Sequence, residues 1–359
     1  MSEEVAERVR AAIADRGPIG FDEYMDIALY GPGGFFEAPP VGPRGHFMTS
    51  PHVHPFVFAH CVRDALLDAW FALGEPDPFP IVELGAGDGT LAGALLSAFG
   101  ELPAPEPAYV GIEISEGARA ALTASGYATA SMIGELEPFE GVAFANELLD
   151  NLPFLVARGG PDGPVEVRVG VAGASLVEIE VPWTRDLEPP ALVPGETTAV
   201  PVGAFAMFEV LARVLRRGYV LAIDYGTPEG AAGGVRGFRE HRLVADVLSD
   251  PGGTDVTAGV DLSMVAANAR SVGFRVFEPV KQATALAALG HERWERTMRE
   301  MQSMLQERGR NSEAVRVWEA RSRASLLADP SGFGRFWWLV FATDGLPQPA
   351  WLGRARRLD

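Results

Sequence analysis

Short apolar runs alternate with amphipathic segments through the middle of the chain. The apolar runs of strand length are residues 80–84, 109–114, 142–146 and 219–224. The segments with helical periodicity around them are residues 56–73, 89–99, 116–125 and 204–215. Buried strands that alternate with helices are typical of βαβ units. The pattern therefore predicts an α/β fold with a doubly wound, mostly parallel sheet and helices on both faces.

The N-terminal part of the chain departs from this alternation. Residues 3–14 and 21–29 have the spacing of two helices, and a Gly-Pro-Gly-Gly sequence at residues 31–34 ends the second one. Residues 35–51 are rich in glycine and proline and predict an irregular loop.

Period-two alternation indicates an insertion into the α/β core, between the apolar runs at 142–146 and 219–224. Residues 165–169 and 176–181 alternate apolar and polar side chains on either side of a turn at residues 170–175. This spacing predicts an antiparallel β-hairpin.

A second insertion, at residues 281–328, has helical periodicity. Met298, Met301 and Met304 recur in it at helical spacing. We interpret these methionines as core packing, because methionine is a flexible side chain that fills gaps. Residues 333–343 predict a late strand.

These patterns divide the 359 residues into two parts. The first is an N-terminal segment of helices and loops, residues 1–75. The second is a larger domain, residues 76–359, with insertions at about 154–200 and 281–330.

The composition narrows the classes of partner and compartment. A net charge of −18 is unfavourable for binding nucleic acid, which requires a positive field. Cys61 is the only cysteine, so no intramolecular disulfide forms, as in a reducing compartment. The first residues lack the apolar core of a secretory signal, and the apolar run at 336–342 is too short to span a bilayer. We expect a soluble cytoplasmic protein without nucleic-acid or membrane partners, and a homodimer is an open alternative to a monomer.

A glycine-rich turn follows the first predicted strand. Gly85, Gly87 and Gly89 have the spacing G-x-G-x-G, and Glu83 precedes the first glycine by two residues. Such glycines allow a ligand to approach the backbone in the crevice where doubly wound sheets bind nucleotides. The dinucleotide fingerprint needs a glycine where this chain has Thr90. S-adenosylmethionine needs no phosphate site but does need an acceptor for its amino group, so the turn and Glu83 favour it over a nicotinamide or flavin cofactor.

A second acidic residue supports this interpretation. Glu113 ends the next predicted strand, where a carboxylate can accept hydrogen bonds from both ribose hydroxyls. Taken alone, Glu113 is also compatible with a solvent-exposed strand end, and the glycines with a structural turn. The turn, the strand and the second acid together favour a cofactor site.

Several segments carry motifs that occur in the same order in a known family. They are residues 17–19, 24–25, 29–36, 45–51, 82–91, 145–153, 223–226, 236–239 and 255–261. They resemble signatures of the MidA-like family of methyltransferases, such as G-D-F-x-T-S-P at 45–51 and V-E-L-G-P-G-x-G-T-L at 82–91. The resemblance covers nearly the whole chain. It implies a class I, Rossmann-like methyltransferase fold and S-adenosylmethionine as cofactor. It also implies a protein arginine as methyl acceptor, as in the mitochondrial members needed for assembly of respiratory complex I.

The chain departs from the family pattern in the N-terminal loop. His46 and His52 stand where the family usually has Asp and Glu, and Ala59 follows Phe58 where a glycine is expected. These differences bear on the acceptor more than on the cofactor. A bacterial member need not share the mitochondrial substrate.

Polar residues at strand ends are the candidate catalytic groups, because methyl transfer requires an aligned nucleophile and, for some acceptors, removal of a proton. Glu147, Asp150 and Asp224 can pair with the N–H groups of a guanidinium. Asn146 can position an amine or amide beside the cofactor. Each carboxylate has a structural alternative, which is a helix dipole contact for Glu147 and a turn cap for Asp150 and Asp224.

The loop residues leave more alternatives open. Thr49 and Ser50 either contact the carboxylate of the cofactor or cap the next helix. His241 is a candidate catalytic group if the glycine-rich segment before it acts as a lid, and otherwise a surface histidine. Four histidines lie within residues 46–60, and His52 and His54 could bind a metal if the loop placed a third ligand nearby. The chain has a single cysteine and no H-E-x-x-H motif, so we predict no metal site.

The sequence thus predicts S-adenosylmethionine-dependent methyl transfer, with a protein arginine as acceptor by family resemblance. One alternative is a small-molecule O- or N-methyltransferase. Another is an assembly factor that binds the cofactor without catalysis.

Overall fold

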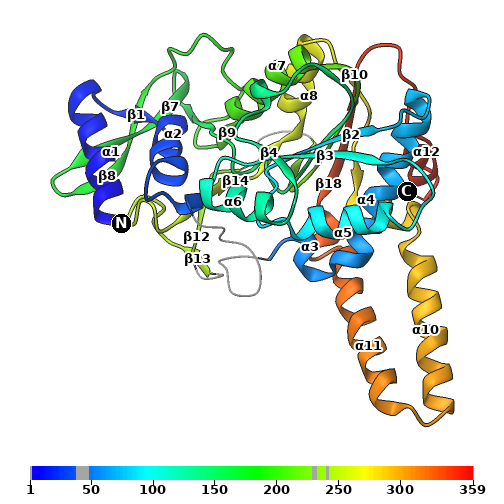
Figure 1. Ribbon diagram of the computed structural model, residues 1–359. Helices are drawn as coiled ribbons and strands as arrows, with labels where there is room; N and C mark the ends of the chain where they lie inside the picture. Colours follow the sequence, from blue (N-terminus) through cyan, green and yellow to red (C-terminus); the bar gives the residue numbers. More distant parts are fainter. Residues whose placement is uncertain (1, 38–47, 229–232, 240–241, 359) are drawn as a thin grey trace.

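The computed structural model describes residues 2–37, 48–228, 233–239 and 242–358. Within these residues, the centre is an eight-stranded mixed sheet in the order β16-β18-β10-β5-β2-β3-β4, with β17 beside β18 (Figure 1). The parallel strands are β2 Phe79–Leu84, β3 Pro107–Ile112, β4 Ala128–Ala130, β5 Phe139–Asn146 and β10 Leu215–Asp224. At the other edge, β18 Trp337–Ala342 pairs antiparallel with β10, and also with the short strands β16 Arg275–Val276 and β17 Val280–Lys281. The predicted α/β fold is confirmed.

Alternate residues of each central strand pack against opposite layers of helices. Ile81 belongs to the core shared with one layer, whereas its neighbour Val82 belongs to the core shared with the other. The first layer contains α4 Pro55–Leu73, α5 Thr90–Phe99, α9 Gln282–Ala288 and α12 Ala350–Ala355. The second contains α7 Val202–Val214 and α8 Leu262–Ser271. Strands buried on both faces need continuous apolar runs, which is why the central strands could be predicted.

The shortest parallel strand was not predicted. β4 has three residues at the sheet edge and follows α6 Glu116–Ala124. A run of this length carries no readable periodicity.

The predicted hairpin is present, but it is part of a larger antiparallel sheet. β7 Gly163–Ala172 and β8 Ser175–Pro182 pair as expected. This sheet has the order β1-β7-β6-β9 with β8 beside β7, and its other strands are β1 Ile19–Gly20, β6 Leu155–Gly160 and β9 Thr197–Val200. Helices α1 Ser2–Arg16 and α2 Phe21–Met25 pack on it in one apolar core. The N-terminal helices are therefore packed against the insertion (Figure 1).

The second predicted helix changes its winding after one turn. The α-helical part ends at Met25, and Asp26–Tyr30 form a π-helix before Gly31. Single π-helical turns are rare and occur frequently at functional sites.

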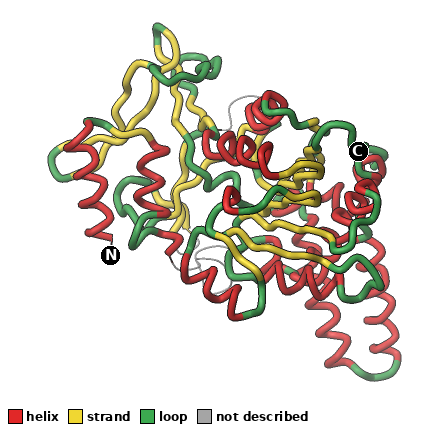
Figure 2. Tube along the Cα trace, turned by 45° about the horizontal axis from the view of Figure 1, so that its top comes forward, coloured by secondary structure: helices red, strands yellow, loops and turns green. Residues whose placement is uncertain are grey.

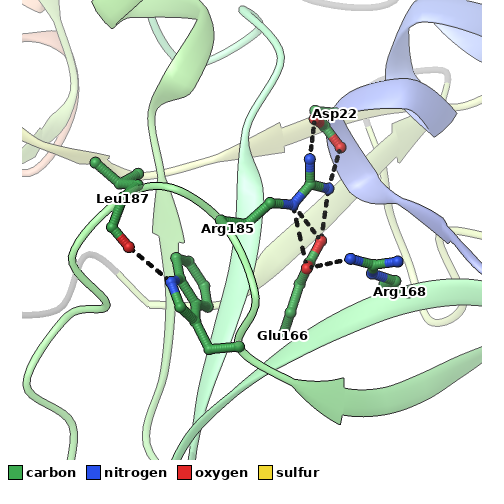
Figure 3. A network of polar contacts seen from close by, with 6 residues as sticks. Asp22, Glu166, Arg168, Arg185 and Leu187 are labelled. Carbon is green, nitrogen blue, oxygen red and sulfur yellow. Dashed lines mark hydrogen bonds and ion pairs between the residues drawn. The ribbon is translucent and has the colours of Figure 1, made fainter.

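A buried ion-pair network joins α2 to the inserted sheet (Figure 3). Glu166 on β7 has a fully buried side chain that accepts hydrogen bonds from Arg168 (2.8 Å) and Arg185 (2.6 Å). Arg185 also donates to Asp22 on α2 at 3.2 Å. Burial raises the pKa of Glu166, but the hydrogen bonds from the two arginines outweigh burial and lower it overall.

We expect Arg185→Met to lower the free energy of unfolding by about 2–3 kcal/mol, because it leaves a buried carboxylate with one of its two cations. Urea unfolding at pH 7 measures this loss. Because the pKa of Glu166 is lowered on folding, its ion pairs stabilise the protein at neutral pH and this contribution is lost as the pH falls. The difference between Arg185→Met and the unmodified protein should therefore shrink in acid.

Arg158→Met is the matched control for this prediction. Arg158 also binds two carboxylates, those of Glu178 and Glu180, but both are largely exposed. We expect a loss below about 1 kcal/mol. Equal losses for the two variants would contradict a special role for the buried network.

The C-terminal insertion forms a helical hairpin of α10 His291–Glu307 and α11 Asn311–Ser325. The interpretation of its methionines as core residues is wrong for two of them, because Met301 and Met304 are 39% and 38% exposed. Leu305, by contrast, is buried. A projecting two-helix hairpin buries only the seam between its helices, so the remaining apolar positions stay at the surface.

The other strands form two small sheets. They are β11 Gly226–Thr227 with β15 Val260–Asp261, and β13 Arg242–Val244 with β12 Val235–Arg239 and β14 Asp255–Ala258. In the part of the chain that the structure describes, each helix is too short or too polar to cross a lipid bilayer.

Candidate functional site

A cavity of about 720 Å³ opens at the carboxyl ends of the central parallel strands. From β2 the chain passes to β3 on one side and later returns to β5 on the other, so the strand order reverses at β2. Crevices at such a reversal are the usual ligand sites of open α/β sheets. The predicted site residues that line the cavity are Thr49, Glu83, Gly85, Gly87, Glu113, Asn146 and Glu147. Ser50, Gly89, Asp150 and Asp224 are not part of the lining, and His241 is outside the described residues.

The glycine-rich turn depends on its glycines for both backbone conformation and packing. Gly85, Gly87 and Gly89 have φ angles of 70°, 55° and 78°, which residues with a side chain adopt only at a cost. A Cβ atom on Gly85 would lie 2.9 Å from the Leu148 side chain, and one on Gly89 would lie 2.7 Å from the Leu122 side chain. The turn therefore keeps the backbone open to the cavity.

Glu113 connects the turn to the next strand. Its Oε2 accepts the Gly87 N–H at 2.9 Å, and its Oε1 accepts the Ser115 N–H at 2.9 Å. Each carboxylate oxygen has a further lone pair, so Glu113 can still accept hydrogen bonds from a ligand in the cavity.

Glu83 is the most deeply buried carboxylate of the lining. Its side chain is 3% exposed, and its Oε2 accepts the Tyr109 hydroxyl at 2.5 Å. Burial raises the pKa of Glu83 to about 8. A cation bound beside it would offset this desolvation and favour the carboxylate form.

Glu147 lies at the end of β5 in a strained conformation. Its φ of 54° is in the left-handed region, and its N–H donates to the Ile223 carbonyl at 2.7 Å. Its Oε1 accepts hydrogen bonds from the Ser50 N–H (2.7 Å) and the Asn146 amide (3.1 Å). Burial raises the pKa of Glu147 to about 8. Strained residues with a left-handed backbone cluster at functional sites.

Asp224 supports the turn that carries Glu147. Its Oδ2 accepts the backbone N–H groups of residues 148–150, at 2.6 to 3.4 Å, and its Oδ1 accepts the Tyr225 N–H at 2.8 Å. The side chain is fully buried, and burial with the charge of Asp150 raises its pKa well above the usual value. This geometry corresponds to the turn-cap interpretation of Asp224. A direct contact with an acceptor in the cavity is not compatible with it.

Asp150 is also turned away from the cavity. Its Oδ2 accepts the Thr257 hydroxyl at 2.8 Å, which joins the turn after β5 to β14. Burial raises the pKa of Asp150 to about 6.

The segment 49–53 crosses from the glycine-rich turn to β5. The Thr49 hydroxyl and His52 Nδ1 are 2.7 Å apart, and His52 Nε2 lies 3.0 Å from Asp88 Oδ2. Ser50 begins the short helix α3 Ser50–Val53 and bonds to Glu147, as described above. Burial raises the pKa of Asp88, but hydrogen bonds from His52 and Thr90 outweigh it and lower the pKa.

The other histidines of this stretch have separate partners. His54 accepts the Val57 N–H and caps α4, whereas His60 lies 3.0 Å from Glu101. His46 is outside the described residues. Among the residues that the structure describes, no three His, Cys, Asp or Glu side chains are grouped as metal ligands.

The ionisable side chains of the cavity lining are nearly all acidic. Among the described residues it contains six carboxylates and neither lysine nor arginine, with His52 as the only basic side chain. The carboxylates are Asp26, Glu83, Asp88, Glu113, Glu135 and Glu147. Such a site favours cationic ligands.

Comparison with known proteins agrees with this geometry. Residues 61–280 match a family model described as "Putative S-adenosyl-L-methionine-dependent methyltransferase". The chain belongs to this family. It is an S-adenosylmethionine-dependent methyltransferase.

Similar proteins extend over most of the chain. The mitochondrial protein arginine methyltransferase NDUFAF7 homolog of Drosophila melanogaster is 27% identical over 92% of this chain and 82% of that protein. The human NDUFAF7 protein arginine methyltransferase is 28% identical over 77% of this chain and 71% of that protein. A crystal structure from Burkholderia thailandensis with bound S-adenosyl-homocysteine is 26% identical, with a TM-score of 0.81 over 97% of this chain and 93% of that one.

The methyltransferase has groups that fit its cofactor. The turn at Gly85–Gly89 leaves the backbone open, and Glu83 and Glu113 provide acceptors on either side of it. Asn146 Oδ1 is buried and has no hydrogen-bond partner among the described residues. Buried polar atoms are nearly always satisfied, so this atom is suited to an N–H or O–H donor of a bound molecule.

Several parts of the lining were not predicted, and two of them carry polar side chains that sequence reasoning missed for a clear reason. Ser131, Met132 and Glu135 follow β4, and that strand was too short to be recognised. Asp26 and Tyr30 belong to the π-helix, which α-helical periodicity does not reveal. The change in winding before the Gly-Pro-Gly-Gly sequence is a tertiary effect without a local signal.

Proposed function

We propose that this methyltransferase modifies the guanidinium of an arginine residue in a protein substrate. The acidic lining of the cavity carries this proposal, because a guanidinium is a permanent cation that pairs with carboxylates. The relatives named above as protein arginine methyltransferases support the same acceptor.

We assign the cofactor to the glycine-rich turn of a doubly wound sheet. Glu83 would accept a hydrogen bond from the amino group of S-adenosylmethionine, and Glu113 would accept hydrogen bonds from its ribose hydroxyls. Gly85, Gly87 and Gly89 would give the cofactor access to the backbone, with Gly89 acting through the shape of the turn. Thr49 and Ser50 would lie beside the cofactor, because their segment contacts Asp88 through His52 and contacts Glu147 through the Ser50 N–H.

We assign the acceptor to the end of β5. When bound, S-adenosylmethionine supplies an electrophilic methyl group. The residues of this chain then have to hold the acceptor nitrogen, exclude water and take its proton. We assign Glu147 to binding the guanidinium and accepting its proton. We assign Asn146 to orienting an N–H group of the guanidinium, because its Oδ1 has no other hydrogen-bond partner among the described residues. Asp150 and Asp224 act as positioning residues, because they hold the turn that carries Glu147.

Transfer of a labelled methyl group tests the acceptor. Purified protein would be incubated with methyl-labelled S-adenosylmethionine and a lysate from a strain that lacks it. We expect the label in protein, and we expect mass spectrometry to locate the added methyl group on arginine side chains. Label confined to small molecules would replace the proposal with a small-molecule N- or O-methyltransferase. Tight cofactor binding without any transfer would indicate an assembly factor.

A further inference from the structure

The helical hairpin of α10 and α11 projects from the body of the molecule (Figures 1 and 2). Its main contacts with the body lie at its base, through α9, α4 and the 3₁₀ turn Leu326–Ala328. With 17 residues, α10 is about 25 Å long. Most of the surface of the hairpin is therefore available to another molecule.

Large apolar side chains are exposed on both helices. Met301 and Met304 on α10 are 39% and 38% exposed, and Val315 and Trp318 on α11 are 52% and 49% exposed. Large apolar side chains exposed on a surface favour protein association, because their burial is favourable.

One face of α10 carries an ordered pattern of charge. A groove of about 480 Å³ is lined by this helix through Arg296, Arg299, Glu300, Ser303, Met304 and Glu307. The arginines lie toward the base of the hairpin, and Glu307 lies at its tip. Residues 296, 300, 303 and 307 follow one another at helical spacing and share a narrow stripe. Within the described residues, neither Arg296 nor Glu307 makes an ion pair.

This pattern is complementary to itself when reversed. We propose that α10 packs antiparallel against α10 of a second copy of this chain, about a two-fold axis near residues 301 and 302. Arg296 then faces the partner's Glu307, and symmetry repeats the pair at the other end. In this register Met304 packs against the aliphatic stem of the partner's Arg299, and Glu300 faces the partner's Ser303. A parallel arrangement would bring Arg296 onto the partner's Arg296 and is unfavourable.

The overall charge distribution favours the same arrangement. Residues 291–325 hold eight arginines and six glutamates, a net charge of +2 within a chain of −18 that leaves −20 for the remainder. Two bodies of this charge repel each other. Antiparallel hairpins hold the bodies at opposite ends of a contact about 25 Å long, beyond the Debye length at physiological salt. No residue of the hairpin lines the 720 Å³ cavity, so this proposal does not rest on the proposed acceptor.

Charge reversal and its rescue test the proposal. Sedimentation equilibrium on the full chain would compare the unmodified protein with Arg296→Glu, Glu307→Arg and the double variant. We expect a dimer whose dissociation constant rises at least about tenfold in each single variant, because each places like charges opposite each other. The double variant restores opposite charges and should return close to the original value.

The matched control is Asp162→Arg, which reverses a charge on the exposed turn between β6 and β7. It should leave the dissociation constant unchanged, and circular dichroism would verify that each variant keeps its helices. A monomer across the concentration range would overturn the proposal. A dimer that the single variants do not weaken, or that the double variant does not restore, would also overturn it.

Discussion

Glu147→Gln is expected to lower kcat for methyl transfer by about 10²- to 10⁴-fold while cofactor binding stays nearly unchanged. The amide keeps the size of the side chain and can still accept the Ser50 N–H through its oxygen. It cannot neutralise a guanidinium or take a proton from it. Steady-state kinetics together with calorimetric titration of S-adenosylmethionine separates the two effects.

The matched control is Glu135→Gln. Glu135 is another carboxylate of the cavity lining, but it bonds to Ser131 beyond β4, away from Glu147. We expect only a small change in kcat. If both variants lost activity equally, the effect would reflect the overall charge of the cavity, and Glu147 would have no special role.

The pH dependence gives a second measure of Glu147. Because burial raises its pKa to about 8, the carboxyl group of the free protein is mostly protonated at lower pH and pairs poorly with a cation. At saturating cofactor, kcat/KM for the acceptor should rise with pH and level at or below about pH 8, since the positive sulfonium favours the carboxylate. The cofactor must be saturating because the pKa of Glu83 is also raised to about 8, so its ionisation would otherwise change cofactor binding over the same pH range. The residual activity of Glu147→Gln should lack this inflection.

Gly85→Val is expected to abolish measurable binding of S-adenosylmethionine. The valine side chain would start 2.9 Å from Leu148 Cδ1, and Leu148 itself lines the cavity. Valine also resists the positive φ of 70° found at this position. The turn must therefore shift, or Leu148 must move into the space beside the cofactor. Calorimetric titration measures the loss.

Gly126→Val is the matched control for this substitution. Gly126 has a φ of 88° in the turn after α6, and a Cβ atom there meets nothing within 4 Å. It carries the same kind of backbone strain but lies outside the cavity lining. We expect reduced stability with normal cofactor affinity. Normal affinity in Gly85→Val as well would mean that the cofactor does not use this turn.

The central strands and the glycine-rich turn could be predicted because their signals are local. A strand buried on both faces requires an apolar run, and residues 80–84 and 142–146 have one. The inserted hairpin was recognised by its alternation, but its pairing with β1 was not, because β1 has only two residues. Pairing between residues far apart in the chain has no local signature.

The candidate site could be predicted in part for the same reason. Glu147 directly follows β5 and Asp224 ends β10, and nothing in their local sequence distinguishes them. Because β5 and β10 are paired neighbours in the sheet, Glu147 and Asp224 lie close together but in different environments. It places Asp224 beneath backbone N–H groups that it must satisfy, while Glu147 faces the cavity.

By itself, the sequence determined the α/β class and the turn at Gly85–Gly89, and it predicted the cofactor from this turn with the acids Glu83 and Glu113. These features depend on backbone conformation and periodicity, which nearby residues control. Only the tertiary structure decided that Ser50 bonds to Glu147 across 97 positions, that Asp224 is a buried support, and that Met301 and Met304 are exposed. Burial and hydrogen-bond partners follow from the packing of distant segments, and the chemistry of a side chain depends on both.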